Sequence, residues 1–236
     1  MAGEPQHDNG GRRGMTTNSY TLVIGDKNLS SWSLRPWLAL NHCGIPFAEE
    51  CIRLRQPDSK AEILRHTPSG KVPVLKTKLG LVWESLAILE YLAERHPEHG
   101  LWPQGEEARA AARSISAEMH AGFATLRNEM SMDLLSLLPA PPASTALDGD
   151  IRRIAAIWKD TRARFGSGGP FLFGAFSNAD AMYAPVATRF RTYGVDLARF
   201  GDDGTGAAYA ATVLALPAMA KWTQGAKAEM RERASA

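Results

Sequence analysis

The sequence predicts an α/β domain built on a mixed four-stranded sheet, followed by an all-helical domain. Three observations support this fold class. Short β-rich runs alternate with helical patterns early in the 236-residue chain, a segment rich in proline and glycine follows, and the remainder is alanine-rich with helical periodicity. The expected division is a disordered leader at 1–18, the α/β domain at 19–95, a linker at 96–105 and the helical domain at 106–236.

Each element of the first domain has its own local signal. Apolar side chains recur on one face at Ile88, Leu89 and Leu92, which predicts a helix. Gly44, with Pro46 beyond it, is a typical helix end. In chain order, the expected elements are a strand at 20–24, a helix at 34–43, a strand at 47–54, a short helix within 56–70, strands at 72–77 and 81–83, and a helix at 85–95.

The second domain is expected to consist of helices joined by loops. Its loops are marked by the proline-rich and glycine-rich runs LPAPPASTALDG and GSGGP. The expected helices cover 106–138, 150–166, 178–193 and 206–229.

Composition and charge exclude several classes of protein. The net charge is +2, from 27 basic and 25 acidic residues, so charge alone would not hold nucleic acid. No apolar run approaches the ~20 residues of a membrane span, and the N-terminus lacks the apolar region of a secretory signal. Cys43 and Cys51 form no C-x-x-C pair, and no Cys/His cluster has metal-ligand spacing. We therefore expect a soluble, cytoplasmic protein with reduced thiols and no metal.

The stretch SSWSLR at 30–35 is the first candidate for a functional segment. Because proline is tolerated among the first positions of a helix, Pro36 favours Ser33 as the N-cap. Ser30 and Ser31 would then lie in the preceding loop, with their hydroxyl groups free to face a ligand. A hydroxyl donor beside a helix N-terminus stabilises a thiolate and lowers the pKa of the thiol. The alternative is ordinary serine capping of the helix.

The stretch GKVPVL at 70–75 is the second candidate. Proline removes a ladder hydrogen bond, so Pro73 is expected at a sheet edge. If the Val72–Pro73 bond is cis, the backbone N–H and C=O of Val72 point outward. An extended peptide could then pair with them by β-augmentation. The alternative is an ordinary edge-strand proline.

The stretch WESLAI at 83–88 is the third candidate. Glu84 and Ser85 lie where the last strand leads into a helix. Helix N-termini bind anions through free N–H groups, so a ligand carboxylate fits there, and the Glu84 carboxylate can hold an ammonium group. The alternative is that Ser85 only caps the helix.

Taken together, the three segments offer a thiol site, a backbone-pairing edge and paired carboxylate and ammonium sites. These match the tripeptide γ-glutamyl-cysteinyl-glycine. In this order and spacing the chain resembles the cytosolic glutathione S-transferases over roughly residues 20 to 225. The segment FLFGAFSNADAMYAPV at 171–186 looks like part of the family's helical domain, with Ser177 and Asp180 forming a short capping box.

The motif SSWSLR is most similar to the zeta-type motif SSCS-x-R, which identifies a zeta-like, serine-type, bacterial-style member. The resemblance implies a thioredoxin-like N-terminal domain, a homodimer, a role in detoxification, and glutathione as co-substrate without a metal. It implies that Ser30, and after it Ser31, activates the thiol. It also implies glutathione contacts at Trp32, Lys71, Val72, Pro73, Glu84 and Ser85.

The function implied is transfer of the glutathione thiolate to small electrophiles. One alternative is a glutathione-dependent cis-trans isomerase of the maleylacetoacetate or maleylpyruvate type, and another is a non-catalytic glutathione-binding module. Trp32 stands where the zeta motif has cysteine, which argues against a thiol-disulfide reductase. For the isomerase, Arg189 and Arg191 lie near the region expected to bind a diacid, without a clear register.

Overall fold

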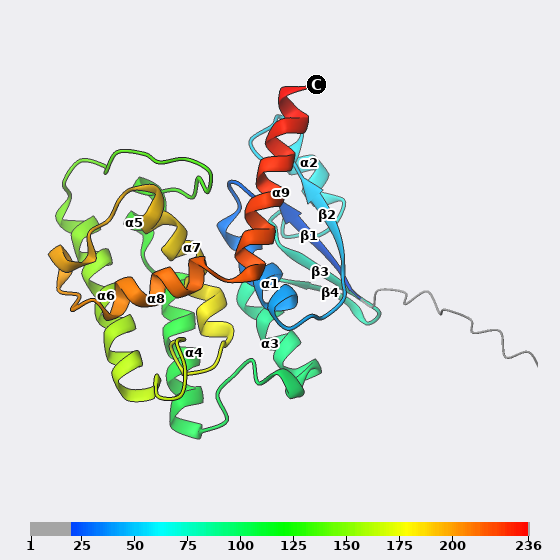
Figure 1. Ribbon diagram of the computed structural model, residues 1–236. Helices are drawn as coiled ribbons and strands as arrows, with labels where there is room; N and C mark the ends of the chain where they lie inside the picture. The colour runs from blue at the N-terminus through cyan, green and yellow to red at the C-terminus, as the bar shows by residue number, and fades with distance from the viewer. Residues whose placement is uncertain (1–19, 236) are drawn as a thin grey trace, which may run out of the picture.

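The computed structural model describes residues 20–235, so the leader expected at 1–18 lies outside the described residues. Four strands form one mixed sheet in the order β2-β1-β3-β4 (Figure 1). Strand β1 pairs in parallel with β2 and antiparallel with β3, and β3 and β4 form an antiparallel hairpin. The strands are β1 (Thr21–Gly25), β2 (Ala48–Ile52), β3 (Val74–Thr77) and β4 (Gly80–Trp83). The predicted sheet is confirmed.

Helices cover the sheet on both faces because successive strand side chains point to opposite sides. Leu22 and Ile24 of β1 belong to the main core with helices α1 (Ser31–His42) and α3 (Ser85–Arg95). Val23, between them, belongs to a smaller core that includes Ile63 of helix α2 (Ser59–Leu64).

The rest of the chain is mainly helical, as predicted, but its boundaries differ from the expected ones. The elements are η1 (Pro97–His99), α4 (Glu106–Ala121), α5 (Ala124–Glu129), α6 (Thr145–Phe165), α7 (Asn178–Thr192), η2 (Leu197–Phe200), α8 (Thr205–Leu214) and α9 (Pro217–Ala234). None of the described helices is both long and apolar enough to span a bilayer.

The single helix expected at 106–138 is wrong. Helix α4 ends at Ala121 with Gly122 as its C-cap, and Phe123 then takes a left-handed conformation with φ of 59°, which redirects the chain into α5. The helix expected at 206–229 is also two helices, because Pro217 starts α9 at a position where its missing N–H is not needed. Helix α6 begins at Thr145, earlier than the expected residue 150, with Ser144 as its N-cap.

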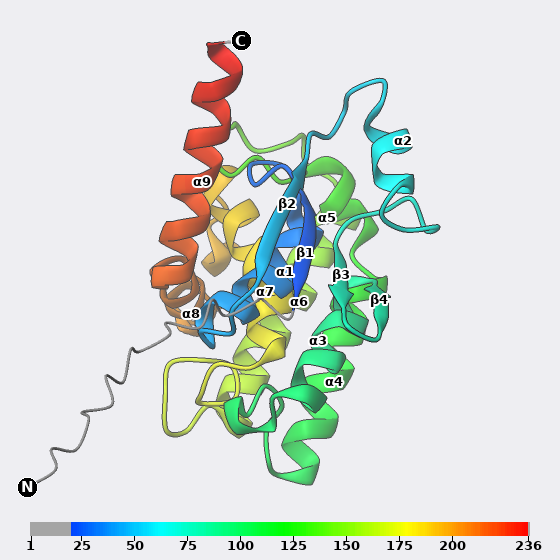
Figure 2. The same ribbon diagram turned by 90° about the vertical axis from the view of Figure 1, so that its right-hand side faces the viewer.

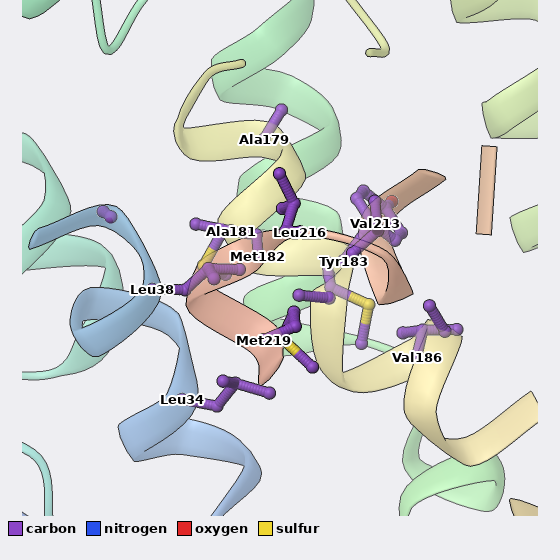
Figure 3. Packing of buried hydrophobic residues seen from close by; sticks show 14 of the residues in the cluster. Leu34, Leu38, Ala179, Ala181, Met182, Tyr183, Val186, Val213, Leu216 and Met219 are labelled. Atoms are coloured by element: carbon purple, nitrogen blue, oxygen red, sulfur yellow. The ribbon is translucent and has the colours of Figure 1, made fainter. Parts of the chain in front are cut away.

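Helix α7 lies at the centre of the molecule and joins the two parts of the chain into one core. Leu34 and Leu38 of α1 face Met182 of α7 and Met219 of α9 (Figure 3). The capping box at the start of α7 is present: the Ser177 N–H donates to the Asp180 carboxylate at 2.8 Å. The packing of α1 against α7 and α9 places the start of α1 next to residues of the helical region that follows the sheet.

Candidate functional site

A cavity of about 540 Å³ opens beside the start of α1. Five of the side chains expected to contact glutathione line it together, although they come from three separate segments of the chain. Helix α4 adds two residues that the sequence analysis did not single out. The lining consists of Trp32, Lys71, Val72, Pro73, Glu84, His120 and Ala121.

The two candidate serines lie beside this cavity without lining it, and their geometry corrects the expectation for Ser33. Ser30 is the N-cap of α1 and accepts from the Ser33 N–H at 3.4 Å. Its hydroxyl also pairs with the Ser33 hydroxyl at 2.7 Å, and Ser33 Oγ accepts from the Gly25 N–H at 3.1 Å. Ser31 is the first helical residue. Pro36 lies inside α1 rather than near its first residue, so it does not mark the helix start.

Val72 and Pro73 lie immediately before β3. The Val72–Pro73 peptide bond is cis. The expectation of an edge strand is wrong, because β3 lies between β1 and β4. Pro73 nevertheless removes no ladder hydrogen bond, since the strand begins at Val74. Among the described residues, neither the N–H nor the C=O of Val72 has a hydrogen-bond partner, so both are available to a ligand.

Glu84 and Ser85 begin α3 in different roles. Glu84 is the N-cap residue, with φ of 68° and ψ of 125°, a conformation that side-chain-bearing residues rarely adopt. Its carboxylate lies 3.9 Å from Lys71 Nζ and 3.6 Å from His120 Nε2. Ser85 is fully buried and accepts from Arg35 Nη1 at 3.2 Å. Ser85 therefore holds Arg35 and does not line the cavity.

Three arginines surround Trp32 and Ser31 from behind the cavity wall. Arg35 lies 4.3 Å from the Trp32 ring, and Arg127 of α5 lies 4.7 Å from it. Arg189 of α7 donates from Nη2 to Ser31 Oγ at 3.0 Å. Within residues 20–235, none of these arginines forms a salt bridge with a carboxylate.

Burial and mutual repulsion make this arginine group unusual. Burial, and then the charges of Arg127 and Arg189, hold the pKa of Arg35 well below its ordinary value. Burial and the charge of Arg127 lower the pKa of Arg189 to about 10. Glu84 and Asp150 offset the charges of Arg35 and Arg127 only in part, from beyond salt-bridge distance, so a further anion nearby is favoured. The arrangement can therefore stabilise a thiolate or a carboxylate beside Ser31 and Trp32.

His120 brings a titratable group from α4 into the cavity. Its ring meets the Trp32 ring edge to face, with 5.2 Å between centroids. Burial, and after it the charge of Arg35, lowers the pKa of His120 below its ordinary value. The imidazole is therefore neutral at neutral pH.

The motifs in the sequence predict most of the cavity wall but not the arginine group. Arg35 belongs to the SSWSLR motif, which assigns it no role of its own. Arg127 lies in α5, whose sequence ATLRNE carries no local signal for a site. Of the two arginines noted for a diacid, Arg189 reaches the site, whereas Arg191 is exposed and donates to the Leu134 carbonyl.

One group of potential metal ligands lies outside the cavity. The donor atoms of His96, Glu98 and His99 lie within 4.8 Å of one another at the surface. His96 Nε2 pairs with the Tyr20 hydroxyl at 3.0 Å, and His96 Nδ1 lies 3.4 Å from Glu98. These contacts fasten the end of α3 to the start of β1, and we assign them that structural role.

Comparison with known proteins supports the fold. Residues 29–95 match the family described as glutathione S-transferase, N-terminal domain. The chain is 34% identical over 106 residues to a probable maleylacetoacetate isomerase of Caenorhabditis elegans, covering 45% of this chain and 49% of that protein. It is 29% identical over 174 residues to the maleylacetoacetate isomerase of Rattus norvegicus, covering 72% and 77%.

Solved structures agree over a longer stretch of the chain. A glutathione transferase from Methylococcus capsulatus superimposes with a TM-score of 0.63 at 25% identity, covering 89% of this chain and 98% of the other. Among the curated relatives, the chain spans about half the length of the first two that it matches, 49% and 56%.

Proposed function

We propose that the chain is a zeta-like member of the cytosolic glutathione S-transferase family and a cytoplasmic enzyme of detoxification that transfers the glutathione thiolate to small electrophiles. The match of residues 29–95 to the family's N-terminal domain supports this proposal. One observation carries the proposal: residues from three separate segments, each suited to a different part of glutathione, line one cavity beside Ser30 and Ser31. The reaction needs no protein general base, because the attacking group is an already ionised thiol.

In this proposal each wall of the cavity holds one part of the tripeptide. Glu84 binds the γ-glutamyl ammonium group, and the N–H groups at the start of α3 bind its carboxylate. The backbone of Val72 pairs with the cysteinyl residue, and Lys71 attracts the glycine carboxylate. Trp32 and Pro73 supply apolar surface. The unpaired backbone groups of Val72 support this orientation.

The thiol is activated by hydrogen bonding and by the local electrostatic field. A free cysteine thiol has a pKa of about 8.5, and lowering it by about two units requires about 2.7 kcal/mol of preferential thiolate stabilisation. A hydroxyl hydrogen bond to an anion supplies about 1.5–3 kcal/mol, and a helix N-terminus adds about 0.3–1 kcal/mol. Ser30, as the N-cap of α1, offers both, while Ser31 and Arg189 add a second donor and a positive charge.

The transferase proposal is tested by product analysis. The full chain is incubated with glutathione and a panel of neutral and anionic electrophiles, and conjugates are measured by mass spectrometry. We expect conjugates to form faster than in buffer and the excess rate to be lost in Ser30→Ala. Glutathione binding without excess turnover on any electrophile would favour the non-catalytic binding module instead.

The arginine group favours isomerisation of an anionic substrate as the second candidate function. Arg35, Arg127 and Arg189 bring three guanidinium groups to one side of Trp32 without a carboxylate partner among the described residues. A substrate that carries carboxylates and lies against Trp32 would be attracted by this group through the cavity wall, whereas a neutral electrophile would not. In the isomerase, glutathione adds to a cis double bond and leaves after the bond has rotated, so glutathione is not consumed.

The two functions differ in what happens to glutathione. A cis-diacid such as a maleyl compound is incubated with the enzyme and a limiting amount of glutathione. Conversion of many equivalents to the trans product per glutathione would establish isomerisation. Stable conjugates formed one for one with glutathione would establish transfer.

We also propose that the protein is a homodimer that buries the surface of strand β4. This edge strand carries exposed apolar side chains at Leu81 and Trp83, and the turn before it carries exposed Leu79. Light scattering after size-exclusion chromatography is expected to give the mass of a dimer for the wild type and of a monomer for Trp83→Lys. Leu64→Lys, at an exposed leucine on α2, is the control. A monomeric wild type would contradict the proposal.

A further inference from the structure

The turn at residues 26–30 joins β1 to α1 and ends at Ser30. Within it, the N–H groups of Leu29 and Ser30 both donate to the Asp26 carbonyl, at 3.1 and 2.8 Å. The position of Ser30 therefore follows that of Asp26 and Lys27. Whatever holds those two residues also sets where the Ser30 hydroxyl points.

One face of helix α9 holds this turn. Trp222, Gly225, Glu229 and Arg233 are spaced three or four residues apart, so they share one side of the helix. Trp222 Nε1 donates to the Lys27 carbonyl at 2.8 Å. The Glu229 carboxylate accepts from the Lys27 N–H at 3.0 Å and from its Nζ at 3.2 Å. Figures 1 and 2 show α9 running beside the α/β part of the chain.

The charges of the turn are buried and paired. Asp26 is fully buried, forms an ion pair with Arg233, and accepts from the Leu54 N–H at 2.6 Å. Lys27 is also buried and forms ion pairs with Glu49 of β2 and with Glu229. Removing one partner would leave the other charge buried and unpaired. The turn is thus fixed by contacts that tolerate little displacement.

Gly225 completes the fit between α9 and the turn. A Cβ atom at this position would lie 2.6 Å from Lys27 Cδ. Glycine disfavours a helix interior, and here its missing side chain leaves the space through which the Lys27 side chain passes. On the other side of the turn, the Asn28 carbonyl accepts from the Leu134 N–H at 3.1 Å. The turn is held between α9 and the loop after α5.

We propose that this face of α9 positions Ser30 for thiol activation. Trp222, Glu229 and Arg233 line no part of the glutathione cavity, so they act through the turn and are positioning residues. The inference rests on the proposed function, in which Ser30 stabilises the glutathione thiolate. It assigns to the C-terminal helix a part in catalysis although the helix touches no substrate.

The test compares Glu229→Gln and Gly225→Ala with the matched control Glu107→Gln. Glu107 forms an exposed ion pair with Arg164 at 2.6 Å, on helices away from the turn. In both α9 variants we expect faster amide hydrogen exchange in residues 26–31 and a pKa of the bound thiol raised by about one unit, with about a threefold loss of kcat at pH 7 that approaches about tenfold at lower pH. The KM for glutathione should change less than twofold, and the control should match the wild type.

Arg233→Lys and Arg233→Met separate the ion pair from general stability. Lysine keeps the charge beside Asp26 and should retain most of kcat, whereas methionine should behave as Glu229→Gln does. Unchanged exchange and an unchanged thiol pKa in Glu229→Gln and Gly225→Ala would overturn the proposal. A loss of activity that only follows a falling melting temperature, with the thiol pKa constant, would overturn it as well. If the wild type binds no glutathione, the proposed function fails, and the exchange rates alone decide whether α9 holds the turn.

Discussion

Two groups of charged side chains meet at the candidate site. They differ in burial and in whether each positive charge is paired with a negative one. At the cavity mouth, Lys71 and Glu84 have side chains that are 75% and 42% exposed, and their opposite charges lie 3.9 Å apart. Behind Trp32, Arg35 and Arg189 are 1% and 5% exposed and have no carboxylate partner among the described residues. Water screens the first group and cannot screen the second.

This difference separates binding from activation. The exposed, balanced pair contributes modest free energy to holding glutathione, because surface ion pairs are worth about 0–1 kcal/mol. The buried arginines act in a medium of low effective dielectric constant, where one positive charge shifts the ionisation of a neighbouring thiol strongly. We therefore expect changes near the serines to affect kcat and changes at the mouth to affect affinity.

The largest effect is expected for Ser30→Ala. Loss of the hydroxyl donor at the helix N-terminus should lower kcat roughly 10²- to 10³-fold, as loss of one oxyanion donor does in other enzymes, and should weaken glutathione binding far less. Steady-state kinetics and calorimetry measure the two quantities. Ser30→Thr keeps both the hydroxyl and the helix cap and is the matched control. Full loss in Ser31→Ala with none in Ser30→Ala would reverse the assignment.

A smaller effect is expected for Arg189→Met. Removing this buried charge should raise the pKa of the bound thiol by about one unit and weaken the affinity for anionic electrophiles about tenfold. Inhibition by a series of carboxylates measures the second effect. Arg191→Met, two residues further along the same helix and exposed, should change neither. Equal effects of the two variants would show that net charge, and not the buried site, is responsible.

Glu84→Gln should change affinity only modestly. Loss of the carboxylate that binds the γ-glutamyl ammonium should weaken glutathione binding by about 1 kcal/mol, or about fivefold, and leave kcat within about a factor of two. Titration calorimetry and kinetics on the same preparation measure both. A large loss of kcat would mean that the exposed and buried groups do not act separately.

The smallest effect concerns the titration of His120. Its pKa lies below the ordinary 6.5 because burial and Arg35 disfavour the charged ring. Because the folded state holds His120 in its neutral form, this histidine adds to the free energy of unfolding above about pH 6.5. That contribution is lost as the pH falls below about 6.5, where the unfolded chain binds the proton more readily. NMR titration of His120 should give a midpoint below 6.5, and Arg127→Met should move it upward. A midpoint above 6.5 would contradict the electrostatic account of the site.

Local patterns predicted the sheet and most elements because strands and helices leave periodic signals in the sequence. The break between α4 and α5 escaped prediction for a physical reason. Gly122 is the C-cap of α4, and Phe123 is buried with a positive φ that side-chain-bearing residues rarely adopt, so periodicity alone did not mark the break. The N-cap of α1 was also assigned to the wrong serine, Ser33 instead of Ser30. That prediction assumed that Pro36 lies near the first residue of the helix, whereas α1 accommodates Pro36 in its interior.

At the site, the predictable residues were those within short motifs. Lys71 and Val72 lie between Gly70 and Pro73, which indicate a turn, and Glu84 precedes Ser85, a typical helix-capping residue. Such local signals can be recognised from the sequence alone. Arg127 and His120 reach the cavity region only through the packing of α4 and α5, and no local pattern marks their destination. The sequence therefore indicated the residues proposed to bind glutathione more fully than the residues proposed to ionise its thiol.

The central claim is that this site converts bound glutathione to its thiolate near neutral pH. The most direct measurement is the ultraviolet difference spectrum of the protein saturated with glutathione, recorded from about pH 5 to about pH 9, in which thiolate absorbance reports ionisation. We expect an ionisation midpoint about two units below that of free glutathione in the wild type, and a midpoint about one unit higher than the wild-type value in Ser30→Ala. Saturable binding with an unshifted midpoint in the wild type would contradict it.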